Sequence, residues 1–133
     1  MCKEGEAMRT ISTEEAPVAI GPYSQAKVFN RLVFLSGQCP FEPRTGDVVG
    51  SDIESQARQT IMNVGAVLKA SGANFASVIK TTCYLADMND FAKFNAVYEQ
   101  YFVDKPARSC IAVRELPKGV LCEIEVIAEV VQE

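Results

Sequence analysis

The chain has 133 residues, 48% of them hydrophobic, with a formal net charge of −4 and a pI near 4.9. This length suits one domain with its own core and is too short for two domains of ordinary size. The acidic balance disfavours nucleic acid as a partner, because nucleic-acid binding usually depends on a basic patch. The sequence contains no histidine, which excludes Ser-His-Asp and Cys-His catalysis and histidine-bearing zinc sites.

The cysteines and the hydropathy of the chain indicate a compartment. Cysteine occurs at an odd number of positions without C-x-x-C spacing: Cys2, Cys39, Cys83, Cys110 and Cys122. Together with a start that lacks the apolar core of a signal peptide, this predicts free thiols in a reducing environment. No apolar run approaches the roughly 18 residues that span a bilayer. We therefore expect a cytoplasmic protein that does not bind membranes.

The N-terminal part of the chain predicts a lead-in, two strands and a loop. Residues 1–8 (MCKEGEAM) are charged and aperiodic, and are expected to form a flexible lead-in to a single domain over residues 9–133. AKVF and RLVFLSG, which are separated by an Asn-Arg break, predict two strands. Residues 39–51 contain two prolines and two glycines among apolar residues, so they predict a loop.

A long amphipathic helix is predicted within residues 51–72. Its apolar stripe recurs at helical spacing: Ala57, Ile61, Val64 and Leu68. Ser51, three residues before Glu54, predicts a capping box at its start. Gly72 is the predicted residue just past its end.

A strand and a second helix follow. SVIKTTCYLAD is rich in β-branched residues and predicts a strand over about residues 77–85. MNDFAKFNAVYEQYF predicts an amphipathic helix that is capped near Asp87 or Asn89. Its expected buried edge consists of Phe91, Phe94, Tyr98, and Tyr101 or Phe102.

The last two β-rich runs, ARSCIAV and VLCEIEVIAEV, predict a hairpin with RELPKG as its turn region. Alternation along the second arm places one apolar set together: Cys122, Ile124, Val126, Ala128 and Val130. Arg108 and Cys110 are expected on the other face, beside Glu123 and Glu125. The element order β-β-α-β-α-β-β predicts an α+β domain with one mixed sheet and both helices on the same face.

Two explanations of the charged hairpin face remain open. The face is either in contact with water and carries ordinary cross-strand ion pairs, or it is covered by another subunit and lines a pocket. Leu121, Ile127 and Val131, with Ala112, add apolar surface that favours association. An arginine in such a pocket suits a small carboxylate ligand, which the guanidinium binds bidentately.

Other candidate site residues come from short motifs. Cys110 could be a nucleophile or a pocket wall; the wall is favoured because no histidine is available to deprotonate it. Tyr23 follows a Gly-Pro turn in AIGPYSQA, which would hold its ring rigidly for a structural or a binding role. Ser36 and Gly37 end a strand, where a hydroxyl and a backbone N–H can bind an anion. No Walker, G-x-G-x-x-G or metal-ligand pattern is present.

Several stretches resemble, in order and spacing, the RidA/YjgF family of reactive-intermediate deaminases. They are TEEAPVAIGPYSQA, LVFLSGQCP, QARQTIMNVGAVLKASG, VIKTTCYLADMNDFAKFNAVYEQYF, PARSCIAVRELPKG and EIEVIAEV, and together they extend from about residue 10 to residue 131. The resemblance implies a chorismate-mutase-like α+β subunit that forms a homotrimer with a pocket at each subunit interface. It also implies hydrolysis of 2-iminobutanoate and 2-iminopropanoate to 2-oxo acids and ammonia, without a metal or cofactor.

The resemblance also assigns roles to residues of this chain. Arg108 would bind the substrate carboxylate and Glu123 would orient the attacking water. The remaining residues would line the pocket: Tyr23, Ser36, Gly37, Asn95 and Cys110. One departure is the short FVDKPARSC segment with Lys105, because many members have a longer connection there, often with Phe before the proline.

Two alternative functions come from other classes of protein. Some relatives are described as endoribonucleases or translation inhibitors, although the acidic pI and the lack of histidine weigh against cleavage of RNA. The other alternative is a non-catalytic trimer that binds small carboxylates.

Overall fold

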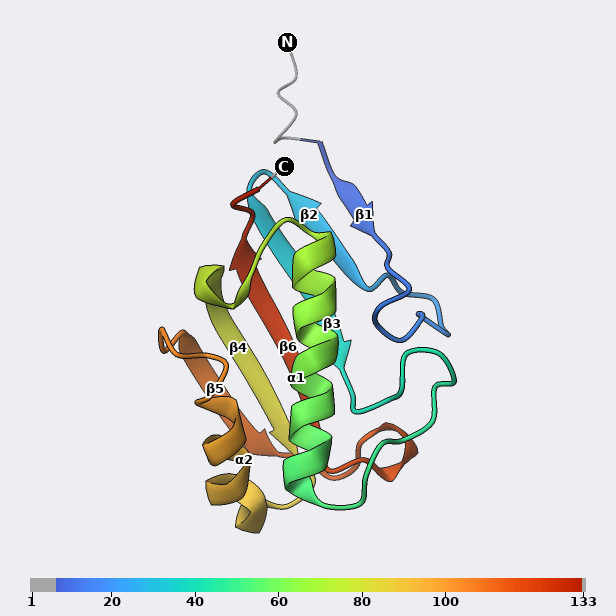
Figure 1. Ribbon diagram of the computed structural model, residues 1–133, viewed down its shortest axis with the longest axis vertical. Helices are drawn as coiled ribbons and strands as arrows, with labels where there is room; N and C mark the ends of the chain where they lie inside the picture. The colour runs from blue at the N-terminus through green and yellow to red at the C-terminus, as the bar shows by residue number, and fades with distance from the viewer. Residues whose placement is uncertain (1–6, 133) are drawn as a thin grey trace.

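A six-stranded sheet carries two helices on one of its faces in the computed structural model of the protein, which describes residues 7–132 (Figure 1). The strands are β1 (Arg9–Ile11), β2 (Ala26–Phe29), β3 (Leu32–Gln38), β4 (Val78–Leu85), β5 (Ala107–Ala112) and β6 (Cys122–Glu129). The helices are α1 (Ile53–Ala70) and α2 (Phe91–Tyr98), and the short 3-10 turns are η2 (Phe75–Ser77), η3 (Met88–Asp90) and η4 (Pro117–Gly119). The predicted α+β class and mixed sheet are confirmed, and β1 is an additional strand at the sheet edge.

The strand order is β1-β2-β3-β6-β4-β5. β6 lies between β3 and β4 and is antiparallel to both, whereas β5 pairs with β4 in parallel at the edge. The predicted hairpin between β5 and β6 is therefore wrong, because β4 separates them. The physical reason is that β6 buries one apolar face along its whole length and gains hydrogen bonds from two neighbours in the middle of the sheet. The β4–α2–β5 segment is a strand–helix–strand unit, and such units normally join parallel strands.

The core lies between the sheet and the helices. On β6, Cys122, Ile124, Val126 and Ala128 are buried and alternate with partly or fully exposed residues, as predicted. The predicted stripe of α1 has no exposed surface: Ala57, Ile61, Val64 and Leu68. On and after α2, Phe94, Tyr98 and Phe102 are buried, as predicted, whereas Phe91 is only partly buried. Tyr98 and Phe102 stack at 4.3 Å between ring centroids.

Acidic residues cap α1 and the turn η3 that leads into α2. The predicted capping box at Ser51 is wrong, because Asp52 caps α1 and accepts a hydrogen bond of 2.8 Å from the backbone N–H of Ser55. A carboxylate there also interacts favourably with the positive end of the helix dipole. The hydrogen bonds from Ser55 lower the pKa of Asp52. Asp87 caps η3 by accepting from Asn89, and α2 continues from that turn.

Gly72 ends α1 in the left-handed region with φ of 81°, as its predicted position requires. Its carbonyl oxygen accepts hydrogen bonds from the backbone of Val131 and Gln132. A Cβ at this position would lie 2.0 Å from the carbonyl oxygen of Gln132. Gly72 therefore joins the end of α1 to the segment that follows β6.

Substitution of Gly72 by Ala is expected to lower the free energy of unfolding by more than about 2 kcal/mol, from backbone strain plus the clash. Urea unfolding of the purified variant measures this loss. Gly119→Ala is the matched control, because Gly119 also has a positive φ of 69° but no atom lies within 4 Å of the added Cβ. Equal losses in the two variants would show that the clash with Gln132 has no effect.

Two predictions concern the ends of the chain and its hydropathy. The lead-in predicted over residues 1–8 lies, except for Ala7 and Met8, outside the described residues. No helix among residues 7–132 combines the length and the apolar character that a membrane span requires.

Candidate active site

A pocket of about 650 Å³ lies at the end of β3 and brings together four of the predicted site residues. Its lining includes Tyr23, Ser36, Gly37 and Glu123. The first three come from the N-terminal part of the chain, and Glu123 comes from β6. Since β3 and β6 are neighbours, the sheet itself places Glu123 next to the Ser-Gly pair.

The GPYSQ segment forms one wall of this pocket. The backbone N–H of Tyr23 donates to the carbonyl oxygen of Gly21 at 2.8 Å, which makes a tight turn and leaves the ring of Tyr23 half exposed. Gln25 is buried, and its amide donates to the carbonyl oxygen of Pro17 at 2.7 Å and accepts from the backbone of Thr13 at 2.7 Å. The segment therefore has a fixed backbone, which suits a binding surface.

The hydroxyl of Ser36 donates to the carbonyl oxygen of Ser24 at 2.6 Å. Its proton is thus engaged within the protein, and its oxygen remains able to accept a hydrogen bond from a ligand or a water molecule. A bulge in the pairing of β3 with β6 lies between Leu35 and Gln38, at the Ser-Gly pair. Bulges are common next to active sites because they redirect side chains.

Glu123 packs directly over Gly37. A Cβ on Gly37 would lie 1.9 Å from a carboxylate oxygen of Glu123, so only glycine leaves room for this carboxylate. Burial raises the pKa of the Glu123 carboxyl above its usual range, while a hydrogen bond from the Cys39 thiol opposes the rise and nearby Glu125 adds to it. The carboxyl is therefore poised nearer to neutrality than an exposed glutamate, as suits a general base.

Arg108 lies in a second pocket, of about 320 Å³, which Asn95 and Tyr98 also line. Its Nη1 donates to Oδ1 of Asn95 at 2.7 Å. Its guanidinium carbon lies 4.8 Å from the ring centroid of Tyr98 and 5.5 Å from that of Phe91. Such contacts orient the planar guanidinium and leave further N–H groups free for a carboxylate.

The two pockets belong to opposite faces of the sheet. Arg108 pairs with Thr81, which is fully buried beneath the helices, so Arg108 leaves β5 on the helix-covered side. Glu123 alternates with the buried Cys122 and Ile124 and leaves β6 on the open side. The prediction that Arg108 and Glu123 share one open face is therefore wrong. It followed from the incorrect hairpin.

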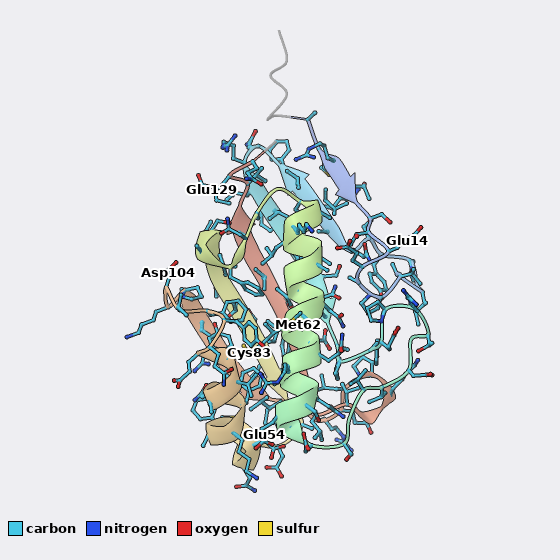
Figure 2. All side chains as sticks on the ribbon, in the orientation of Figure 1. Glu14, Glu54, Met62, Cys83, Asp104 and Glu129 are labelled. Carbon is cyan, nitrogen blue, oxygen red and sulfur yellow. The ribbon has the colours of Figure 1, made fainter. Side chains whose placement is uncertain are left out.

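Cys110 lies on the same side as Arg108 and pairs with Cys83 on β4, and it lines neither of the two pockets described here. Figure 2 shows Cys83 in the part of the sheet beneath the helices. Burial raises the pKa of the Cys110 thiol, and Arg108 opposes this only in part. The neutral thiol is a weak nucleophile.

The sequence model of the Endoribonuclease L-PSP family matches residues 13–130. The chain belongs to this family. The match confirms the resemblance to RidA/YjgF proteins, which the motifs around Tyr23, Ser36 and Arg108 had indicated.

Members of the L-PSP family are similar along nearly the whole chain. A RutC family protein of Pyrococcus horikoshii is 53% identical over 119 residues, covering 89% of this chain and 94% of that protein. A 2-iminobutanoate/2-iminopropanoate deaminase of Salmonella typhimurium is 48% identical over 124 residues, covering 90% of this chain and 96% of that protein. The crystal structure of E. coli TdcF with bound serine has a TM-score of 0.87 and 44% identity, covering 91% of this chain and 98% of that one.

Some neighbours of the site residues in this L-PSP family chain were assigned only to the core by sequence reasoning. Phe91 and Tyr98 belong to the helical apolar stripe, and nothing in that pattern reveals that Arg108 lies over their rings. Cys39 is a free thiol, as predicted, and it also lines the larger pocket beside Glu123, which its sequence context does not reveal. Among residues 7–132, no three cysteine or acidic side chains gather in a group that could hold a metal ion.

Proposed function

We propose that this protein is a 2-iminobutanoate/2-iminopropanoate deaminase that hydrolyses 2-imino acids to 2-oxo acids and ammonia without a cofactor. The observation that carries the proposal is the pair of prepared half-sites: an oriented arginine for a carboxylate, and a buried glutamate with a raised pKa for a water molecule. The similarity to deaminases of this name supports the same activity.

The active site is assembled between subunits of a homotrimer. Because Arg108 and Glu123 lie on opposite faces of one sheet, a single chain cannot offer both to one small substrate. Two copies can do so where the smaller pocket of one meets the larger pocket of the other. The open sheet face supports association, since Phe29, Leu32 and Phe34 are 45%, 38% and 44% exposed there.

In the proposed reaction, Arg108 binds the substrate carboxylate and so fixes the iminium carbon opposite Glu123. The carboxylate of Glu123 accepts a proton from a water molecule, whose oxygen attacks that carbon and forms a carbinolamine. Glu123 returns the proton to the nitrogen, and the C–N bond then breaks. As ammonia leaves, the carboxylate of Glu123 takes the hydroxyl proton, so that the carbonyl forms, and this proton passes to ammonia or solvent. A protonated imine is already electrophilic, so positioning and proton transfer are sufficient.

The other site residues form the walls of this composite pocket. Tyr23 and Gly37 border Glu123, and the oxygen of Ser36 accepts a hydrogen bond from the water or the amino group. Asn95 holds Arg108. Cys110 lies on the same face of β5 as Arg108 but lines neither pocket, and it does not act as a nucleophile. The cysteines described as free thiols, Cys39, Cys83, Cys110 and Cys122, suit a cytoplasmic location.

The pH dependence of turnover follows from Glu123. Its pKa is raised, so the ionised form that accepts the proton is lost as the pH falls through a value above that of an exposed glutamate. We expect kcat/KM to show an acid limb at that raised pKa. Initial rates, corrected for spontaneous imine hydrolysis at each pH, measure the limb; a limb at the pKa of a free carboxylate would contradict the role of burial.

The function is tested by adding the protein to a threonine dehydratase reaction and measuring the release of 2-oxobutanoate. Faster release of 2-oxobutanoate with the wild-type protein supports the deaminase function. No change in that rate with folded protein rejects it. Calorimetry with 2-oxobutanoate identifies a non-catalytic carboxylate-binding protein if binding occurs without turnover. Incubation with single-stranded RNA tests the endoribonuclease, which requires cleavage that survives repurification.

A further inference from the structure

We infer that Tyr98 and Thr81 form a positioning device for Arg108: a hydrogen bond between their hydroxyls locks the aromatic ring beneath the guanidinium, which tightens carboxylate binding. This inference rests on the proposed function and adds two residues to it that act through Arg108. It is carried by contacts from three separate elements, β4, α2 and β5.

The hydroxyl groups of Thr81 and Tyr98 are in direct contact. Oγ1 of Thr81 and the hydroxyl oxygen of Tyr98 are 2.7 Å apart, and both residues are buried. Deep in the core this bond fixes the end of a ring that could otherwise tilt. Burial raises the pKa of the Tyr98 hydroxyl, so it stays protonated.

Neighbouring aromatic rings fix the position of the Tyr98 ring. Phe102 stacks on Tyr98 at 4.3 Å with an interplanar angle of 24°, and Phe94 packs against Tyr98 at 5.8 Å. The two packed rings and the hydroxyl hydrogen bond together hold the ring of Tyr98 in its observed orientation. In that orientation it lies 4.8 Å from the guanidinium carbon of Arg108.

The register between β4 and β5 places Thr81 next to Arg108. Thr81 is the direct strand partner of Arg108, so the residue that holds Tyr98 also sits beside the origin of the arginine side chain. Asn95, one helical turn before Tyr98, binds Nη1 of the same guanidinium. Helix α2 therefore contacts the guanidinium of Arg108 twice, at its edge through Asn95 and at its face through the ring of Tyr98. Strand β4 in turn holds Tyr98 through Thr81.

A guanidinium that is oriented before binding loses less conformational entropy when it engages a carboxylate. Because the carboxylate is held in the ground state and the transition state alike, loss of this orientation should raise KM and leave kcat unchanged. A purely structural role would lower the folded fraction and apparent kcat without changing KM.

The test compares Tyr98→Phe, Thr81→Val and the double variant by calorimetry with 2-oxobutanoate and by imine kinetics. Each single change should raise Kd and KM about threefold, and the double variant should be no worse, since both remove one bond. Tyr98→Leu, which removes the ring, should raise Kd about tenfold. Thr81→Ser keeps the hydroxyl and should therefore have the Kd and KM of the wild type.

Thr60→Val is the matched control, because Thr60 is equally buried but contacts Cys122 rather than Tyr98. It should leave Kd and KM unchanged. If Thr81→Val and Tyr98→Phe had wild-type turnover and an unaltered Kd, the positioning role would be overturned, and the proposed deaminase function would still stand.

A readout without ligand separates this inference from the proposed function. The Nε–H resonance of Arg108 should be shifted upfield by the ring of Tyr98 in wild type and should move downfield in Tyr98→Leu. Such movement in a protein without imine turnover would support the positioning device while rejecting the deaminase. An identical resonance in both proteins would overturn the positioning device.

Discussion

Substitution of Arg108 by Ala is expected to lower kcat/KM for 2-iminobutanoate by about a thousandfold, because two charge-assisted hydrogen bonds to the substrate carboxylate disappear together. The guanidinium is half-buried and already oriented by Asn95 and Tyr98. Lys105 also lines this pocket, but its ammonium group does not offer a planar pair of donors. The coupled dehydratase assay with purified variants measures the loss.

Arg108→Lys is the informative companion to this variant. Lysine keeps the charge but presents a point donor instead of a planar fork, so it should recover only part of the activity. Circular dichroism and thermal unfolding check that both variants remain folded. Wild-type kcat/KM in Arg108→Ala would exclude Arg108 as the carboxylate-binding residue.

Substitution of Gly37 by Ala is expected to lower kcat/KM about a hundredfold while the protein remains folded, because displacement of a catalytic group by about 1 Å costs roughly that much. The new Cβ would lie 1.9 Å from a carboxylate oxygen of Glu123 and 2.8 Å from its carboxyl carbon. The end of that side chain can swing away, so the clash moves the carboxylate and not the backbone. Enzyme kinetics and thermal unfolding of the same sample measure the two effects.

A double-variant cycle isolates the cause of this loss. Glu123→Ala should lower kcat/KM by more than Gly37→Ala does while leaving measurable turnover, and adding Gly37→Ala to it should cause no further loss, because the group that the Cβ displaces is gone. Gly37→Ala with wild-type kinetics, or an additional large loss in the double variant, would contradict the proposed contact.

The sequence predicted the features that depend on near neighbours in the chain. The stripe of α1 from Ala57 to Leu68 and the alternation of β6 follow from helical and strand periodicity, and each is confirmed. The position of Gly72 follows from the backbone conformation that ends a helix. The cap was missed by one residue because Ser51 and Asp52 are both good caps, and only the fold decides between them.

Pairing of distant strands was predicted less well. A tight turn between β5 and β6 suggested a hairpin, but η4 instead returns the chain to the middle of the sheet. The signal that could have corrected this was α2 itself, since a helix between β4 and β5 favours a parallel pair. The error moved Arg108 to the wrong face and concealed that the two halves of the site are apart.

The division of the site between faces changes how its chemistry is understood. Glu123 and Gly37 form a half-site that can prepare a water molecule, and Arg108 with Asn95 forms one that can hold an acid. Neither is sufficient alone. Activity in this account therefore depends on subunit assembly as well as on the residues themselves. If the proposed trimer forms, dilution below its dissociation constant should abolish activity.

The most direct test of this account is subunit complementation between two inactive variants. Arg108→Ala keeps Glu123, and Glu123→Gln keeps Arg108, so a mixed trimer can contain an interface with both native residues. Denaturation and joint refolding of an equimolar mixture should restore about a quarter of wild-type activity, because half of the subunits supply each side of an interface. Activity no greater than that of the two variants refolded separately would contradict a site shared between subunits.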